Sequence, residues 1–156
     1  MIRRLARPML AAIFIVSGLD TLRHPGGRAQ LASPLLDRIA PMLRLPDDKE
    51  LLVRANGTAM LVGGTMLASG KLPRLSAAVL FGTLVPTTLA AHSFWDKPDA
   101  AARAQDRIQF LKNLGLMGGL LLAAVDTEGQ PGLAWRARRL RRDADKRITA
   151  ARAAHS

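Results

Sequence analysis

The side chains in this sequence that could bind a ligand or move a proton stand near the ends of apolar stretches. They are an aspartate, an arginine, a histidine, and a lysine followed by an asparagine: Asp20, Arg54, His92, Lys112 and Asn113. Ionisable groups in membrane segments face other helices and find partners there, because hydrocarbon solvates charge poorly. Two interpretations are open: Asp20 pairs with Arg54 or Lys112 and fixes the helix register, or the layer forms a polar floor for a small ligand.

The residue types that are missing exclude several classes of site. The chain has no cysteine, which removes disulfides, thiolate nucleophiles, iron–sulfur clusters and cysteine zinc sites. Its three histidines, His24, His92 and His155, are not spaced for a zinc-binding helix or for paired haem ligation. Phosphate-binding glycine loops and the nucleophile elbow of hydrolases are also missing from the sequence. We therefore expect no metal site and no intrinsic cofactor.

The elements that must position these side chains are apolar helices. In a chain of 156 residues, only three of the charged residues fall in the windows 5–22, 55–70, 75–95 and 108–125. A soluble helical bundle carries charges along the outer face of every helix, whereas these outer faces suit lipid. The sequence therefore predicts an all-α fold, a transmembrane four-helix bundle with spans of about 3–22, 50–69, 73–94 and 106–125.

The ends of these stretches carry further signals. The first stretch also resembles a secretory signal peptide, but Asp20, Arg23 and His24 follow it and no A-x-A cleavage site appears, so we expect a retained helix. Asp47 with Glu50 three residues later predicts a capped start for the second span. The prediction is therefore four spans, the first of them kept in the mature protein.

The placement of Lys and Arg predicts the orientation. Four crossings from a cytoplasmic N-terminus put thirteen of them on the inner side and eight on the outer side. This is the positive-inside pattern of an inner-membrane protein with both termini in the cytoplasm, with a membrane domain at 5–126 and a basic tail at 127–156. The net charge of +11 is then largely topological, which argues against a nucleic-acid partner. The tail is expected to bind anionic lipid headgroups through Arg136, Arg138, Arg139, Arg141 and Arg142.

The first outer loop and the helix faces carry predictions of their own. Apolar residues at three- and four-residue spacing predict a short amphipathic helix between Pro34 and Pro46, which either covers the polar layer or lies on the membrane surface as a spacer. Arg54 shares a face with Gly57 and Gly64, and Lys112 shares one with Gly115 and Gly119. Small residues let membrane helices approach closely, so both charges are predicted to project where helices meet.

Pro86 lies inside the third apolar stretch and is followed by two threonines. A proline at such a place is predicted to kink the helix, while the hydroxyls of Thr87 and Thr88 bind the carbonyls that it frees.

A pair of short motifs resembles a known family. The stretch His92-Ser-Phe-Trp95 is followed by Phe110-Leu-Lys-Asn113 and by Gly118-Gly119, and between Arg7 and Asp126 the chain resembles the DoxX family of bacterial membrane proteins. The resemblance implies a four-helix inner-membrane protein associated with redox complexes. Related proteins are named as subunits of quinone-linked thiosulfate oxidation, and others are linked with oxidative-stress defence. The motif residues that it marks are His92, Phe94, Trp95, Phe110, Lys112 and Asn113.

Three functions are compatible with these features. The first is an accessory or scaffold subunit of a membrane redox or oxidative-stress complex, with no catalysis by the chain alone and with redox proteins or further copies of itself as partners. The alternative is a quinone-binding oxidoreductase subunit in which His92, Lys112 and Asn113 bind a quinone carbonyl while Trp95 and Phe110 flank the ring. A small-solute transporter is the third. The candidate site comprises His92, Phe94, Trp95, Phe110, Lys112, Asn113, Asp20 and Arg54.

Overall fold

The computed structural model describes residues 2–126, 138–139 and 141–142. The chain divides into two units, Met1–Val125 and Asp126–Ser156. The elements of the first unit are, in order, α1 (Ile2–Arg23), α2 (Pro25–Leu43), α3 (Lys49–Ser69), α4 (Pro73–Ala91), the short 3-10 helix η1 (Phe94–Asp96) and α5 (Ala100–Val125). In the second unit, the helical and exposed residues that the structure describes are Arg138, Arg139, Arg141 and Arg142. Arg136, a predicted lipid contact, lies outside the described residues.

Four of these helices have the length and apolar composition needed to cross a bilayer. They are Ile2–Arg23, Lys49–Ser69, α4 together with η1, and Ala100–Val125, each of at least 21 residues. Since about 20 apolar residues cross the hydrocarbon layer, the predicted all-α transmembrane four-helix bundle is confirmed. The N-terminus of α3 is capped by Asp48 rather than by the predicted Asp47, because Asp48 Oδ1 accepts a hydrogen bond from the Leu51 N–H at 2.9 Å.

Helices α1 and α3 pack at unusually short range, and glycines make this approach possible. A Cβ atom at Gly18 would lie 2.7 Å from the Leu61 nitrogen and 2.8 Å from the Gly57 oxygen. A Cβ atom at Gly64 would lie 2.8 Å from Cγ1 of Ile15. At Gly57 a Cβ atom would lie 2.9 Å from Cγ2 of Thr21, so Gly57 and Gly64 both lie at the interface of α1 with α3, as predicted.

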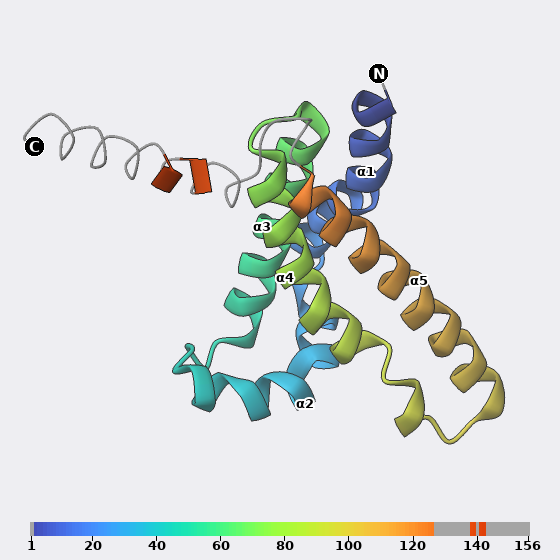
Figure 1. The fold of residues 1–156 in the computed structure, drawn as a ribbon. Helices are drawn as coiled ribbons and strands as arrows, with labels where there is room; N and C mark the ends of the chain where they lie inside the picture. The colour runs from blue at the N-terminus through green and yellow to red at the C-terminus, as the bar shows by residue number, and fades with distance from the viewer. Residues whose placement is uncertain (1, 127–137, 140, 143–156) are drawn as a thin grey trace, which may run out of the picture. The chain divides into compact units, whose positions relative to one another are not determined.

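Helix α5 meets the rest of the bundle differently from the prediction. It packs chiefly on α4 and leans away from the other helices toward its N-terminal end (Figure 1). Within residues 2–126, no atom would lie within 4 Å of a Cβ atom added at Gly115. A Cβ atom added at Gly119 would contact only the side chain of Leu10 on α1, whose Cδ1 would lie 3.5 Å away. The prediction that the whole Lys112 face projects into a helix interface is therefore wrong, because α5 crosses the bundle instead of running along it.

Helix α2 is longer than the predicted amphipathic segment and starts nine residues earlier, at Pro25. Pro25 occupies the first turn, where its missing N–H costs nothing, and Pro34 lies inside the helix. Helix α2 crosses the end of the bundle where α3 begins and α4 ends, and it contacts both (Figure 1). Its last turn closes at Arg44, which takes a left-handed backbone conformation with φ of 52°.

Candidate functional site

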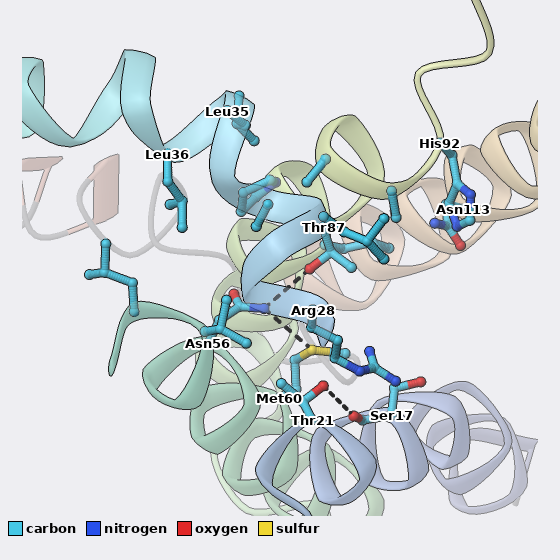
Figure 2. Close-up of a pocket in the computed structure, with 18 of the residues that line it drawn as sticks. Ser17, Thr21, Arg28, Leu35, Leu36, Asn56, Met60, Thr87, His92 and Asn113 are labelled. Carbon is cyan, nitrogen blue, oxygen red and sulfur yellow. Dashed lines mark hydrogen bonds between the residues drawn. The ribbon is translucent and has the colours of Figure 1, made fainter. Parts of the chain in front are cut away.

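A cavity of about 680 Å³ lies beneath α2, and all five α-helices of the first unit contribute to its walls (Figure 2). Most of the lining is apolar, and α2 supplies Leu31, Leu35, Leu36 and Ile39. Helix α2 therefore covers this cavity, and of the predicted polar layer His92, Lys112 and Asn113 lie in the lining.

Ion pairs tie α2 to the bundle near its beginning and in its second half. Near its beginning, the Arg28 guanidinium donates to the carboxylate of Asp20 at the end of α1. In its second half, Asp37 Oδ1 lies 2.7 Å from Nζ of Lys49 at the start of α3. Because these groups are substantially exposed, each pair holds the cover weakly and can open.

Two asparagines contribute polar groups to the cavity, and adjacent threonines of α4 hold both. Asn56 of α3 donates from Nδ2 to Oγ1 of Thr87 at 3.1 Å, and Asn113 of α5 donates to Oγ1 of Thr88 at 3.1 Å (Figure 2 shows the first bond). All four side chains come from helices that are long and apolar enough to cross a membrane. Together they link α3, α4 and α5 around the cavity.

The two threonine hydroxyls are themselves committed to backbone carbonyls. Thr87 Oγ1 donates to the Thr83 oxygen and Thr88 Oγ1 donates to the Leu84 oxygen, both at 2.7 Å. Pro86 has no N–H, so the carbonyl that loses its donor is that of Gly82. The prediction that the two hydroxyls bind this carbonyl is wrong, because they bind the carbonyls of Thr83 and Leu84. Helix α4 nevertheless continues through Pro86 to Ala91.

His92 stands at the C-terminal end of α4 and lines the cavity beside Asn113 (Figure 2). Its Nδ1 lies 3.4 Å from Oδ1 of Asp106 on α5, and Nζ of Lys97 lies 3.4 Å from the other oxygen of the same carboxylate. The side chains of His92 and Asp106 are 25% and 19% exposed. Asp106, which is not among the residues predicted for the site, is thus the hydrogen-bond partner of the imidazole.

The aromatic residues of the candidate site form a cluster of their own outside the cavity. The Phe94 ring centroid lies 5.1 Å from that of Trp95 and 5.5 Å from that of Phe110, and all three pairs meet edge to face. Since none of the three lines the cavity, the structure does not place Trp95 and Phe110 on either side of a ligand there. They join η1 to α5 instead.

The predicted partners of Asp20 are corrected by the structure. Asp20 pairs with Arg28 and has His24 Nδ1 at 3.2 Å, while Arg54 pairs with Glu50 one turn earlier on its own helix at 2.7 Å. Because α2 begins at Pro25, nine residues before the predicted helix, Arg28 lies next to the end of α1 and pairs with Asp20 there. Asp20 and Arg54 do not line the cavity, whereas Lys112 contributes to its lining with an exposed side chain.

A comparison with protein families gives one result that decides the classification. The family model described as DoxX matches residues 3–93, more than half of the chain. This chain belongs to the DoxX family. The match covers α1 to α4 and includes His92, while Phe94, Trp95, Phe110, Lys112 and Asn113 follow it. No curated protein and no solved structure matches the chain.

The cavity of this DoxX protein presents groups that can form hydrogen bonds with a ligand. Within the described residues, no group of three or more His, Cys, Asp or Glu side chains could hold a metal ion. What the cavity offers is an apolar wall with the imidazole of His92, the amides of Asn56, Gln109 and Asn113, and two cationic side chains, those of Arg28 and Lys112. Such a cavity suits a ligand that is mostly apolar and carries polar atoms at its ends.

Proposed function

We propose that this DoxX protein is a subunit of a membrane redox complex and binds a quinone-class ligand in the cavity beneath α2. The observation that carries the proposal is the cavity itself, which has a largely apolar lining and a few hydrogen-bonding groups from α3, α4 and α5. Its volume of about 680 Å³ lies in the range of small-molecule sites. A quinone matches this chemistry because it is a flat apolar ring with a carbonyl oxygen at each end.

His92, Asn113 and Lys112 supply the donors for one end of such a ligand. When Nδ1 of His92 carries the hydrogen and donates it to Asp106, the other ring nitrogen, Nε2, is left to accept a proton or return it. Electron transfer to or from the ligand needs a redox centre, which would belong to a partner protein. The chain would therefore bind and orient the ligand rather than catalyse a reaction alone.

A second candidate function, the accessory or scaffold subunit, is favoured by the surface of α5. Within the described part of this helix Leu120 is the one buried residue, and a Cβ atom built at Gly115 or Gly118 meets nothing within 4 Å. Small residues on an open face let a second membrane helix approach closely. Copurification of stoichiometric partners under mild detergent extraction would support this function, and a lone monomer in full yield would contradict it.

We place the protein in the inner membrane with both termini in the cytoplasm and the α2 end of the bundle outside. The excess of Lys and Arg on the side of the termini supports this orientation. Exposed Arg138, Arg139, Arg141 and Arg142 would then meet anionic headgroups. Reporter fusions at residue 1, residue 156 and the loop after α4 test it: cytoplasmic signals at both ends and an external signal in the loop are expected, and termini on opposite sides would refute it.

Binding of a quinone to the purified protein tests the first proposal directly. The full chain in lipid nanodiscs is titrated with duroquinone by equilibrium dialysis, and saturable binding near one equivalent is expected. His92→Ala and Asn113→Leu each remove a proposed donor and should weaken binding about tenfold, the effect of losing roughly 1.4 kcal/mol. Gln105→Ala, an exposed change on the same helix as Asn113, is the control and should leave binding unchanged. Absence of saturable binding to the unmodified protein would overturn the proposal.

A further inference from the structure

The amide of Asn56 has a fixed orientation because of the bonds that surround it. The single hydroxyl hydrogen of Thr87 is donated to the Thr83 oxygen at 2.7 Å, so Thr87 Oγ1 can only accept from Asn56. The nitrogen Nδ2 also donates to Sδ of Met60, at 3.6 Å (Figure 2). Both hydrogens of the amide are therefore directed at protein atoms, and a flipped amide would set oxygen against two acceptors.

The amide oxygen of Asn56 is left as an acceptor without a donor. None of residues 2–126 donates a hydrogen bond to Oδ1, and no fully buried side-chain oxygen or nitrogen in the described chain lacks a partner. Oδ1 is therefore accessible, in a residue that lines the cavity. An acceptor in an apolar cavity gains most from a ligand that brings its own hydrogen.

A second acceptor lies at the same end of the cavity. Thr21 of α1 is buried and lines the cavity, and its hydroxyl hydrogen is donated to the Ser17 oxygen at 2.7 Å (Figure 2). Arg28 is the cation at this end, and part of its guanidinium is engaged by Asp20. A hydroxyl group can donate to Asn56 and accept from Arg28 at once, whereas a carbonyl oxygen can only accept.

We propose that the cavity binds the reduced, hydroxyl-bearing form of its ligand, a quinol, more tightly than the quinone, with Asn56 Oδ1 accepting the ligand O–H. The inference rests on the proposed quinone-class ligand and adds which redox form the site prefers. One net hydrogen bond corresponds to a preference of about tenfold. By linkage, a tenfold preference for the quinol raises the two-electron potential of the bound pair by about 30 mV. A ligand held in this way is a stronger electron acceptor than it is in the bilayer.

The test compares the two redox forms on the same protein. Full-length protein in nanodiscs is dialysed without oxygen against duroquinone or against its dithionite-reduced hydroquinone, and the ratio of the two dissociation constants is measured. The unmodified protein should bind the hydroquinone about tenfold more tightly. Asn56→Leu removes the acceptor at similar volume and should bring the ratio close to one by weakening hydroquinone binding. Thr58→Val, an exposed change on the same helix, should leave the ratio at its original value.

Two further variants separate the role of the oxygen from general damage to the cavity. Thr87→Val keeps the shape of the side chain but frees the Asn56 amide to rotate, so the ratio should fall because quinone binding improves. Asn113 uses one hydrogen of its Nδ2 to bind Thr88 and keeps the second for a ligand, so Asn113→Leu should weaken binding of both forms and preserve the ratio. A folded Thr87→Val protein keeps the inference testable even where Asn56→Leu does not fold.

The outcomes distinguish this inference from the function on which it rests. If neither form binds the unmodified protein, the quinone-class ligand and the preference both fall. If both forms bind with equal affinity, or if the ratio survives in Asn56→Leu and Thr87→Val, the ligand class stands and the role of Asn56 is overturned. A hydroquinone preference that disappears in both variants, while Thr58→Val retains it, supports the assignment.

Discussion

Replacing Gly18 by alanine should separate α1 from α3 and destabilise the bundle. The added Cβ would lie 2.7 Å from the Leu61 nitrogen and 2.8 Å from the Gly57 oxygen, and ordinary contact begins at 3.4 Å. Both neighbours are backbone atoms in the middle of a helix, so no side-chain rotation relieves the clash. The helices must move apart by about 0.7 Å at the crossing, the difference between 3.4 and 2.7 Å.

The size of the effect follows from two opposing contributions. Overpacking of a tight contact costs about 1 to 3 kcal/mol, while alanine gains up to about 1 kcal/mol over glycine in a helix interior. The expected net loss in free energy of unfolding is about 1 to 2 kcal/mol, a five- to thirtyfold change in the ratio of folded to unfolded protein. The separation should also weaken ligand binding, because Thr21 and Met60 line the cavity close to this contact.

Unfolding in mixed micelles of increasing denaturing-detergent content, followed by circular dichroism, measures this free energy. Gly82→Ala and Gly115→Ala are matched controls, since a Cβ built at either meets nothing within 4 Å in the described chain. Both controls should be neutral or stabilised by up to about 1 kcal/mol. If Gly18→Ala is as stable as Gly82→Ala, the close approach of α1 and α3 does not exist in the folded protein.

Three other changes probe the cover, the aromatic cluster and a helix cap. Asp20→Asn weakens the ion pair with Arg28, so hydrogen–deuterium exchange measured by mass spectrometry should become faster in α2 and stay the same in α3. If α2 exchanges at the same rate in the variant and the unmodified protein, this ion pair does not hold α2 on the bundle. Phe110→Ala removes two edge-to-face contacts and should cost about 1 kcal/mol in unfolding free energy with a red shift of tryptophan emission; an unchanged spectrum would argue against the cluster. Asp48→Ala removes the cap of α3 and should cost about 1 kcal/mol in the same unfolding assay, whereas Asp47→Ala should cost less.

The membrane spans could be predicted because the sequence separates charge from apolar stretches, and lipid imposes that separation on every outer face. The extent of α2 could not be predicted from the same pattern. Residues 25–33 include Gly26 and Gly27, which are poor helix formers, and they show no regular apolar spacing. Pro34 looked like a helix start, but it lies inside α2 after Pro25 has begun the helix.

The candidate site was found in part, through its charged and motif residues. His92, Lys112 and Asn113 line the cavity as a group, but Asn56 was passed over because a lone uncharged amide resembles an ordinary span residue. A signal was present: the chain has two asparagines, and both lie inside predicted spans. Polar side chains inside a membrane span need hydrogen-bond partners, so Asn56 and Asn113 together could have predicted one polar site between the helices. Arg28 was missed because its place depends on the start of α2.

The division between charged and uncharged polar groups has a physical cause. Charge is costly to bury in a low-dielectric interior, so the ion pairs of Asp20 with Arg28 and of Asp37 with Lys49 form between exposed side chains, where they join α2 to the end of α1 and to the start of α3. Neutral amides are cheaper to place inside, so Asn56 and Asn113 reach the cavity. Of the ionisable residues that the sequence reveals, Asp20 and Arg54 therefore form ion pairs outside the cavity, while His92 and Lys112 line it together with the two uncharged asparagines.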